Sequence, residues 1–322
     1  MVIGERVLVA LGGNAMTAPD GSASPQAQTR AVAAAMEPVA DLVAAGAEVV
    51  LTHGSGPQVG NLLIKNELAA QVVPPVPLDW CDAQVQATVG VLIMNALDRA
   101  LADRGASRPV TALVTRTLVD PGDPAFAAPT KPIGRYFSPE EAERCAILGS
   151  HWRSYGERGL RRVVASPDPL DILEAPAVTA LLDAGHVVVA AGGGGVPVVP
   201  VDGAPRGVEA VVDKDLGAAL LARLVGASVL VIATEVDRVQ AGYGTPQARS
   251  LGRTTVGELR ALAAAGHFPE GSMGPKVEAA VRFVTSGGRR AAITSLDGIA
   301  AAAAGTAGTI VEAENVTVGT QE

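Results

Sequence analysis

The amino-acid sequence predicts an α/β protein, a three-layer αβα sandwich with an open, mainly parallel sheet. Two observations lead to this prediction. Short apolar runs typical of strands alternate with alanine-rich helical stretches over most of the 322 residues, which is the order of consecutive βαβ units. The strands read as nearly continuous apolar runs, which is typical of a parallel sheet that helices cover on both faces.

The elements are expected in a regular order along the chain. Strands are expected at the short apolar runs, at residues 7–11, 48–52, 110–115, 186–191, 229–233 and 291–294. Helices are expected at the alanine-rich stretches between them, at residues 26–45, 59–69, 83–102, 175–184, 216–225, 256–265 and 276–286. The alanine run near Ala300 is also expected to be helical.

The section from residue 120 to residue 169 breaks this rhythm. It opens with the Pro/Gly-rich segment 120–124 and holds five of the nine aromatic residues. A structureless loop of that length is unusual inside a compact domain. We therefore expect one domain over residues 1–322, with residues 120–169 forming a small inserted lid subdomain.

The composition excludes several classes of protein. Apolar residues make up 48% of the chain and charged residues 18%, as in globular proteins. The net charge of −8 argues against a nucleic-acid or anionic-membrane partner. Apolar runs fall short of the about 18 residues of a membrane span, and the first residues lack a signal-peptide pattern, so a cytoplasmic protein is expected. Cys81 and Cys145 lack metal-type spacing and are expected to be reduced thiols, and no residue is assigned as a metal ligand.

Glycine-rich turns follow several of the predicted strands. They are Gly12-Gly13-Asn14, the segment 53–58 and the segment 192–195. Ligands of open α/β sheets bind at the carboxyl ends of the strands, where glycine lets backbone N–H groups approach an anion. The nucleotide fingerprint GxxxxGK[ST] is absent and residues 53–60 do not read GxGxxG, so a P-loop enzyme is excluded and a dinucleotide oxidoreductase is disfavoured.

Lysine is rare in this chain, because only four of the 25 basic residues are lysine. Three of the four, Lys131, Lys214 and Lys276, lie beside Gly, Pro or Asp in predicted loops. A lysine offers a compact ammonium that arginine does not replace, which suits phosphate oxygens. Asp215 precedes the predicted helix 216–225 and is expected to be its N-cap as well as a neighbour of Lys214.

Taken together and in this order, the motifs resemble carbamate kinase, a family of the amino-acid-kinase superfamily. The resemblance runs from about residue 6 to residue 311 and rests on the segments 9–15, 52–61, 129–134, 162–167, 207–215 and 266–276. It implies the amino-acid-kinase fold, an ATP/ADP and Mg²⁺ site across the strand ends, a homodimer, and phosphoryl transfer between carbamoyl phosphate and ADP. Because carbamoyl phosphate is a high-energy acyl phosphate, ATP synthesis is the expected direction in the cell.

The resemblance also assigns roles to residues. Gly12, Gly13 and Asn14 would hold phosphate oxygens, and Gly54, Ser55 and Gly56 would hold the carbamate or carbamoyl group. Lys214 and Lys276 would neutralise the phosphates with Asp215 orienting them, and the lid would bring Lys131 over the acceptor. The nucleotide would lie against Glu235, Val236, Asp237, Met273 and Gly274.

The chain departs from the family pattern at two places. The family often has Asn where this chain has Ser55. It usually shows a Gly-Ala-Met-Ser-Gln-Gly run where this chain has residues 82–87; Gln86 fits this run, whereas Asp82, Gln84 and Ala87 differ. Two alternatives stay open: an enzyme of the same superfamily acting on another small acid, and a non-catalytic nucleotide-binding regulator. The regulator predicts loss of Lys214, Asp215 or Lys276, and all three are present.

Overall fold

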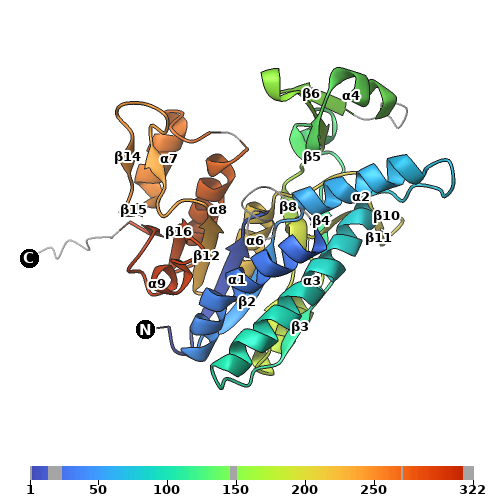
Figure 1. Cartoon of the computed structure of the whole chain (residues 1–322). Coiled ribbons are helices and arrows are strands. Elements are labelled where there is room, and N and C mark those ends of the chain that lie inside the picture. The colour runs from blue at the N-terminus through green and yellow to red at the C-terminus, as the bar shows by residue number, and fades with distance from the viewer. Residues whose placement is uncertain (1, 14–23, 146–150, 270, 315–322) are drawn as a thin grey trace, which may run out of the picture.

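The computed structural model describes residues 2–13, 24–145, 151–269 and 271–314. Its main sheet is eight-stranded, and only the pair of strands β16 and β17 runs antiparallel. In Figure 1 this sheet crosses the middle of the molecule with helices in front and behind. The order across the sheet is β15 (Arg253–Thr255), β17 (Thr309–Glu312), β16 (Arg290–Ser295), β12 (Val229–Thr234), β1 (Arg6–Leu11), β2 (Glu48–His53), β9 (Val187–Val189) and β3 (Val110–Ala112).

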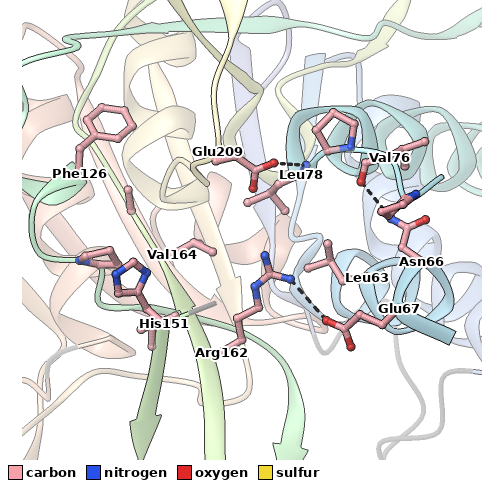
Figure 2. A pocket seen from close by; sticks show the side chains of 15 residues that line it. Leu63, Asn66, Glu67, Val76, Leu78, Phe126, His151, Arg162, Val164 and Glu209 are labelled. Atoms are coloured by element: carbon pink, nitrogen blue, oxygen red, sulfur yellow. Dashed lines mark hydrogen bonds and ion pairs between the residues drawn. The ribbon is translucent and has the colours of Figure 1, made fainter. Parts of the chain in front are cut away.

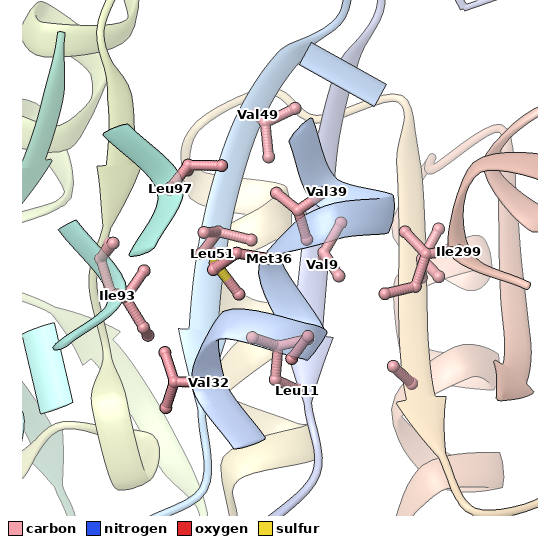
Figure 3. Packing of buried hydrophobic residues seen from close by; sticks show 14 of the residues in the cluster. Val9, Leu11, Val32, Met36, Val39, Val49, Leu51, Ile93, Leu97 and Ile299 are labelled. Atoms are coloured by element: carbon pink, nitrogen blue, oxygen red, sulfur yellow. The ribbon is translucent and has the colours of Figure 1, made fainter. Parts of the chain in front are cut away.

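Helices cover both faces of this sheet because its central strands are apolar on both sides. In β1, Val9 and Leu11 pack into one core and Leu8 and Ala10 into the other, as the two-residue period of a strand requires. Figure 3 shows the first core, where Val9 and Leu11 meet Met36. This core is covered by α1 (Pro25–Ala44), α3 (Leu78–Asp103) and α9 (Ile299–Ala303). The opposite core is covered by α5 (Ala175–Asp183), α6 (Lys214–Leu224), α7 (Val256–Ala264) and α8 (Met273–Thr285).

Two smaller sheets lie at one side of the main sheet. One has the order β11 (Ala204–Gly207), β10 (Val196–Val201), β4 (Arg116–Val119) and β8 (Pro169–Ile172). The other is antiparallel and has the order β5 (Lys131–Phe137), β7 (Leu160–Val164) and β6 (His151–Ser154). A two-stranded pair, β13 (Gln240–Ala241) and β14 (Arg249–Ser250), lies near α7.

The β5–β7–β6 sheet belongs to the segment 120–169, which we call the insert. In its described residues the insert also holds two short 3₁₀ turns and α4 (Pro139–Cys145), and in Figure 1 it stands out from the body above α2 (Gly56–Ala69). Phe137 and Trp152 pack edge to face, with ring centroids 5.1 Å apart. Gly60 of α2 touches Gly134 of β5 so closely that a Cβ on Gly60 would lie 2.7 Å from the Gly134 nitrogen. This contact seats the insert on the body.

The predicted fold class is confirmed, and the predicted boundaries need corrections. The helix expected at 83–102 begins five residues earlier, because Leu78 and Cys81 pack into the core directly after Pro77. The strand expected at 186–191 ends at Val189, because the left-handed φ of 50° at Ala191 turns the chain into the glycine segment. In the described part of the chain, no helix combines the length and apolarity needed to span a bilayer.

Candidate active site

The glycine turns after β1 and β2 meet at one edge of the sheet. The Gly54 N–H donates to the carbonyl of Leu11 at 3.0 Å, and the Gly12 N–H donates to the carbonyl of Ala233 at 3.2 Å. A Cβ on Gly54 would lie 2.9 Å from the Gly13 nitrogen and 3.5 Å from Cδ of Lys214. At Gly12 and Gly54 the fold therefore uses the absence of a side chain for close approach, while their N–H groups are already bonded within the protein.

The turn after β9 closes the same edge from the other side. Gly193 has a φ of +68°, and a Cβ there would collide with the hydroxyl of Ser55. Ser55 precedes α2 as its N-cap without a capping side-chain bond, and it is buried. Gly56 begins α2 with open space where a Cβ would lie. Asn14 lies outside the described residues, so the structure places only Gly12 and Gly13 of that turn.

A cluster of two lysines and one aspartate lies at the N-termini of α6 and α8. Asp215 in the first turn of α6 forms ion pairs through both oxygens: Oδ1 with Lys214, and Oδ2 with Lys276 of α8 at 2.9 Å. The side chains are 5% (Asp215), 13% (Lys214) and 14% (Lys276) exposed. The structure thus brings together residues that are 61 positions apart in the chain.

Burial and charge act in opposite directions on this cluster. Burial alone would raise the pKa of Asp215, but the neighbouring Lys214 and Lys276 ammonium groups outweigh it and lower the pKa to about 2. Burial lowers the pKa of Lys214, and the Asp215 carboxylate offsets part of that effect. Asp215 is therefore an anion at neutral pH, held between two amines directed at the same site.

Asp213 is a residue of this site that the sequence analysis missed. It, and not Asp215, is the N-cap of α6, because its Oδ1 accepts from the backbone N–H groups of Asp215 at 2.9 Å and Leu216 at 3.3 Å. Its other oxygen, Oδ2, forms an ion pair with Lys131 at the start of β5. The insert therefore supplies a lysine to the body. With Asp213 and Lys131 included, the cluster comprises three lysines and two aspartates. The signal in the sequence was an aspartate directly before a helix that begins at Lys214.

A cavity of about 240 Å³ adjoins the cluster on the side of β12. Glu235 and Val236 line it from the segment after β12, and Met273 and Lys276 line it from α8. Tyr243, which the sequence analysis did not select, lines it as well. Two expected residues are absent from this lining: Asp237, and Gly274, whose N–H donates to the carbonyl of Pro269 at 3.0 Å.

His53 lies under the glycine turns without a catalytic geometry. Burial lowers its pKa to about 4, so the ring is neutral near neutral pH, and Nδ1 lies 2.9 Å from the carbonyl oxygen of Gly54, to which it donates. A Cβ on Gly192 would collide with the ring. The position agrees with a structural hydrogen bond.

The residues of α3 that were compared with the family pattern lie in two environments. Gln86 is buried, donates to the carbonyl of Thr115 at 3.1 Å and accepts from its N–H at 2.9 Å. Asp82 is buried with no hydrogen-bond partner for either oxygen among the described residues, and burial, aided by nearby Asp79 and Glu209, raises its pKa well above the usual value. Gln84 and Ala87 are exposed.

Chemically, this edge of the sheet suits a polyphosphate. The N-termini of α2, α6 and α8 meet there with three lysines, and both features favour anions. Fixed cations beside a partly enclosed cavity are the arrangement that stabilises the charge of a phosphoryl group in transfer. The fold and the site define a protein of the amino acid kinase family: that family's model matches residues 5–295, and the chain belongs to the family.

Within this family the chain belongs with the carbamate kinases. It is 44% identical to "Carbamate kinase" of Thermococcus kodakarensis, over 96% of this chain and 100% of that protein. It is also 44% identical to "Carbamate kinase-like protein YahI" of Escherichia coli, over 95% of this chain and 98% of that protein. Among solved structures, carbamate kinase from Giardia lamblia bound to AMP-PNP is similar with a TM-score of 0.90 and 38% identity, over 98% of this chain and 100% of that one.

Proposed function

We propose that this protein is a carbamate kinase that transfers a phosphoryl group reversibly between carbamoyl phosphate and ADP. The observation that carries the proposal is the buried cluster in which Asp215 holds Lys214 and Lys276. Similarity over nearly the full length to proteins named carbamate kinase supports the same reaction. The nucleotide lies in the 240 Å³ cavity beside Lys276, next to Glu235 and Met273.

In the direction of ATP synthesis, a terminal oxygen of ADP attacks the phosphorus of carbamoyl phosphate. The bond between that phosphorus and the carbamoyl oxygen breaks, and carbamate leaves as an anion. In the reverse direction carbamate is already an anion, so neither direction requires a general base. Lys214 and Lys276 stabilise the charge on the transferring oxygens, and Asp215 fixes both ammonium groups before substrate arrives.

Mg²⁺ fits this site as a partner of the nucleotide. Among the described residues, no group of three or more Asp, Glu, His or Cys side chains could hold a metal ion, and both cluster aspartates are paired with lysines. Mg²⁺ commonly binds through substrate phosphates, water and one or two carboxylates. When bound to ADP, it would neutralise phosphate charge next to the lysines.

The insert acts in this proposal as a lid over the acceptor. Its support is the position of Lys131, which reaches the body from the first residue of β5 and pairs with Asp213. Pro129 and Pro132 flank the lysine and stiffen its strand. Substrate would exchange places with Asp213 at the Lys131 ammonium as the insert closes.

The acceptor is tested by comparing acyl phosphates. ATP formation from ADP and Mg²⁺ is measured with carbamoyl phosphate, acetyl phosphate and acetylglutamyl phosphate. We expect the highest kcat/KM with carbamoyl phosphate, because the chain is similar over nearly its full length to proteins named carbamate kinase. A preference for another acyl phosphate would assign the chain to a different activity in the family, and ATP formation from none would support the regulator.

The protein is also proposed to act as a homodimer. Trp80 is 60% exposed and Val91 is 48% exposed on α3. They are eleven positions apart, so they lie on nearly the same side of the helix. Large apolar side chains exposed together on one helix are typical of a surface that a partner covers. The proposal places the cytoplasmic enzyme in solution as two copies that meet on this side of α3.

A further inference from the structure

A second and larger cavity lies beside the strand that carries Lys131, because Val164 in its lining pairs with Lys131. It has a volume of about 560 Å³, within the usual range of about 300–1,000 Å³ for small-molecule sites. Its walls come from β6 and β7 of the insert, and from α2, the start of α3 and the segment between β11 and α6 in the body. None of the cluster residues lines it. The phosphoryl-transfer reaction therefore does not account for this cavity.

Arg162 and Glu67 face each other across this cavity, one from the insert and one from the body. Their closest N–O distance is 3.7 Å, and their side chains are only 15% and 13% exposed. Nε of Arg162 is buried without a hydrogen-bond partner, and neither charged group forms a hydrogen bond to another described residue. A largely buried ion pair that lacks hydrogen bonds is costly unless something else satisfies it.

A second carboxylate completes the polar part of the cavity. Glu209 accepts from the N–H of Leu78 through Oε1 at 3.0 Å, which leaves Oε2 available. Figure 2 shows Arg162 between Glu67 and Glu209, with apolar side chains such as Val164 around them. The charged groups on the walls are thus one cation and two anions, with apolar surface between them.

We propose that this cavity binds a basic α-amino acid, a molecule with one carboxylate and two ammonium-type groups. Its carboxylate pairs with the Arg162 guanidinium, whose planar fork suits a carboxylate. Its α-ammonium bonds to Glu67, which the short separation from Arg162 permits, and its side-chain cation reaches Glu209. Its methylene groups lie against Leu78 and Val164. The ligand's net charge of +1 balances the net negative charge that one arginine and two glutamates give the site.

Such a ligand would connect the insert to the body. Arg162 belongs to β7, whereas Glu67 belongs to α2. Pro129, which also lines the cavity, lies two residues before Lys131. Occupancy therefore restricts the strand that carries the lysine of the insert, and the ligand acts on the enzyme as an effector without touching the phosphoryl group.

The test uses lysine and three analogues that each lack one charged group, measured by calorimetry on the unaltered full chain. Norleucine lacks the side-chain ammonium, 6-aminohexanoate lacks the α-ammonium, and 1,5-diaminopentane lacks the carboxylate. Each deletion is expected to weaken binding by on the order of tenfold or more, because each removes a charge-assisted hydrogen bond. Equal affinity for all four compounds, or no binding of lysine at millimolar concentration, would overturn the proposal.

Substitutions then assign each group to its residue. Glu209→Gln should abolish the preference for lysine over norleucine. Glu67→Gln should abolish the preference for lysine over 6-aminohexanoate. Arg162→Met should abolish the preference for lysine over 1,5-diaminopentane. Arg153→Met, at an exposed arginine of β6, is the matched control and should bind as the unaltered chain does. Hydrogen exchange over residues 131–137 and 160–164 should slow when lysine binds. Preferences that persist in all three variants would place the binding elsewhere and refute the site.

Discussion

Asp215 is the residue on which the two half-buried lysines Lys214 and Lys276 depend. It binds both ammonium groups while remaining 5% exposed, so its removal leaves two cations without their shared anion. A group whose folded pKa lies at about 2, below the usual unfolded value of about 3.9, stabilises the fold above the unfolded value. That contribution is lost as the pH falls toward about 2.

The first prediction follows from the lowered pKa of Asp215. The free energy of unfolding of the unaltered protein should fall as the pH decreases from about 5 toward 2, and Asp215→Asn should show a shallower fall. Urea titrations at several pH values measure both slopes. Asp41→Asn, at an exposed ion pair with Arg104 on the surface, is the control and should keep the slope. Identical slopes for Asp215→Asn and the unaltered chain would contradict the assigned charge state.

The lysines of the cluster give the second prediction. Lys214→Ala or Lys276→Ala should lower kcat by on the order of 10²–10³, the usual loss for one preorganised group that stabilises charge. Arginine should replace either lysine poorly, because its planar fork does not match a compact ammonium. Lys65→Ala, at the exposed lysine of α2, should retain full activity. Normal kcat in either cluster variant, with the fold intact by circular dichroism, would remove that lysine from the mechanism.

At the scale of elements, the contacts between the insert and the body include the Lys131–Asp213 ion pair and the close approach of Gly60 to Gly134, beside the Arg162–Glu67 and Asp168–Arg282 pairs. The third prediction concerns the ion pair of Lys131 with Asp213. Lys131→Ala should reduce kcat/KM for carbamoyl phosphate much more than it changes the affinity for ADP, because Lys131 acts on the acceptor side. Equal losses for both substrates, or no loss, would leave the insert a structural appendage.

The fourth prediction concerns the contact between Gly60 of α2 and Gly134 of the insert. Gly60→Ala places a Cβ against the Gly134 backbone and must displace β5, and with it Lys131. We expect kcat/KM for carbamoyl phosphate to fall by roughly tenfold or more, because small misplacements of a catalytic group are costly. Gly252→Ala, where a Cβ would meet open space, is the control. Unchanged kinetics in Gly60→Ala would show that the contact between Gly60 and Gly134 does not position Lys131.

Some elements of the fold could be predicted from the sequence and others could not. The central strands were predictable because β1 and β12 are unbroken apolar runs buried on both faces. The sheet β11–β10–β4–β8 was not, because β4, β8 and β11 have only four residues each, β8 and β11 contain Pro169 and Pro205, and β4 pairs with β8 and β10 across large separations in the chain. The lysines were selected by their scarcity, whereas the Lys131–Asp213 pair spans 82 positions and leaves no local pattern.

At the scale of the whole molecule, the sheet positions the site and α3 carries the surface proposed to form the dimer. The fifth prediction is that light scattering after size exclusion gives twice the chain mass of 32.4 kDa. Trp80→Glu, which places a charge on that surface, should shift the mass toward one chain. Leu170→Glu, at a 52% exposed apolar residue of β8, is the control and should leave the mass unchanged. A single-chain mass for the unaltered protein would contradict the proposed assembly.

The most direct test of the central claim is phosphorus NMR of the unaltered protein mixed with carbamoyl phosphate, ADP and Mg²⁺. We predict that the carbamoyl phosphate signal falls while the γ-phosphate signal of ATP rises in equal amount, because the cluster around Asp215 transfers the phosphoryl group without releasing it to water. Loss of carbamoyl phosphate to inorganic phosphate without ATP, or no loss beyond its spontaneous decay, would contradict the assignment of this site to phosphoryl transfer.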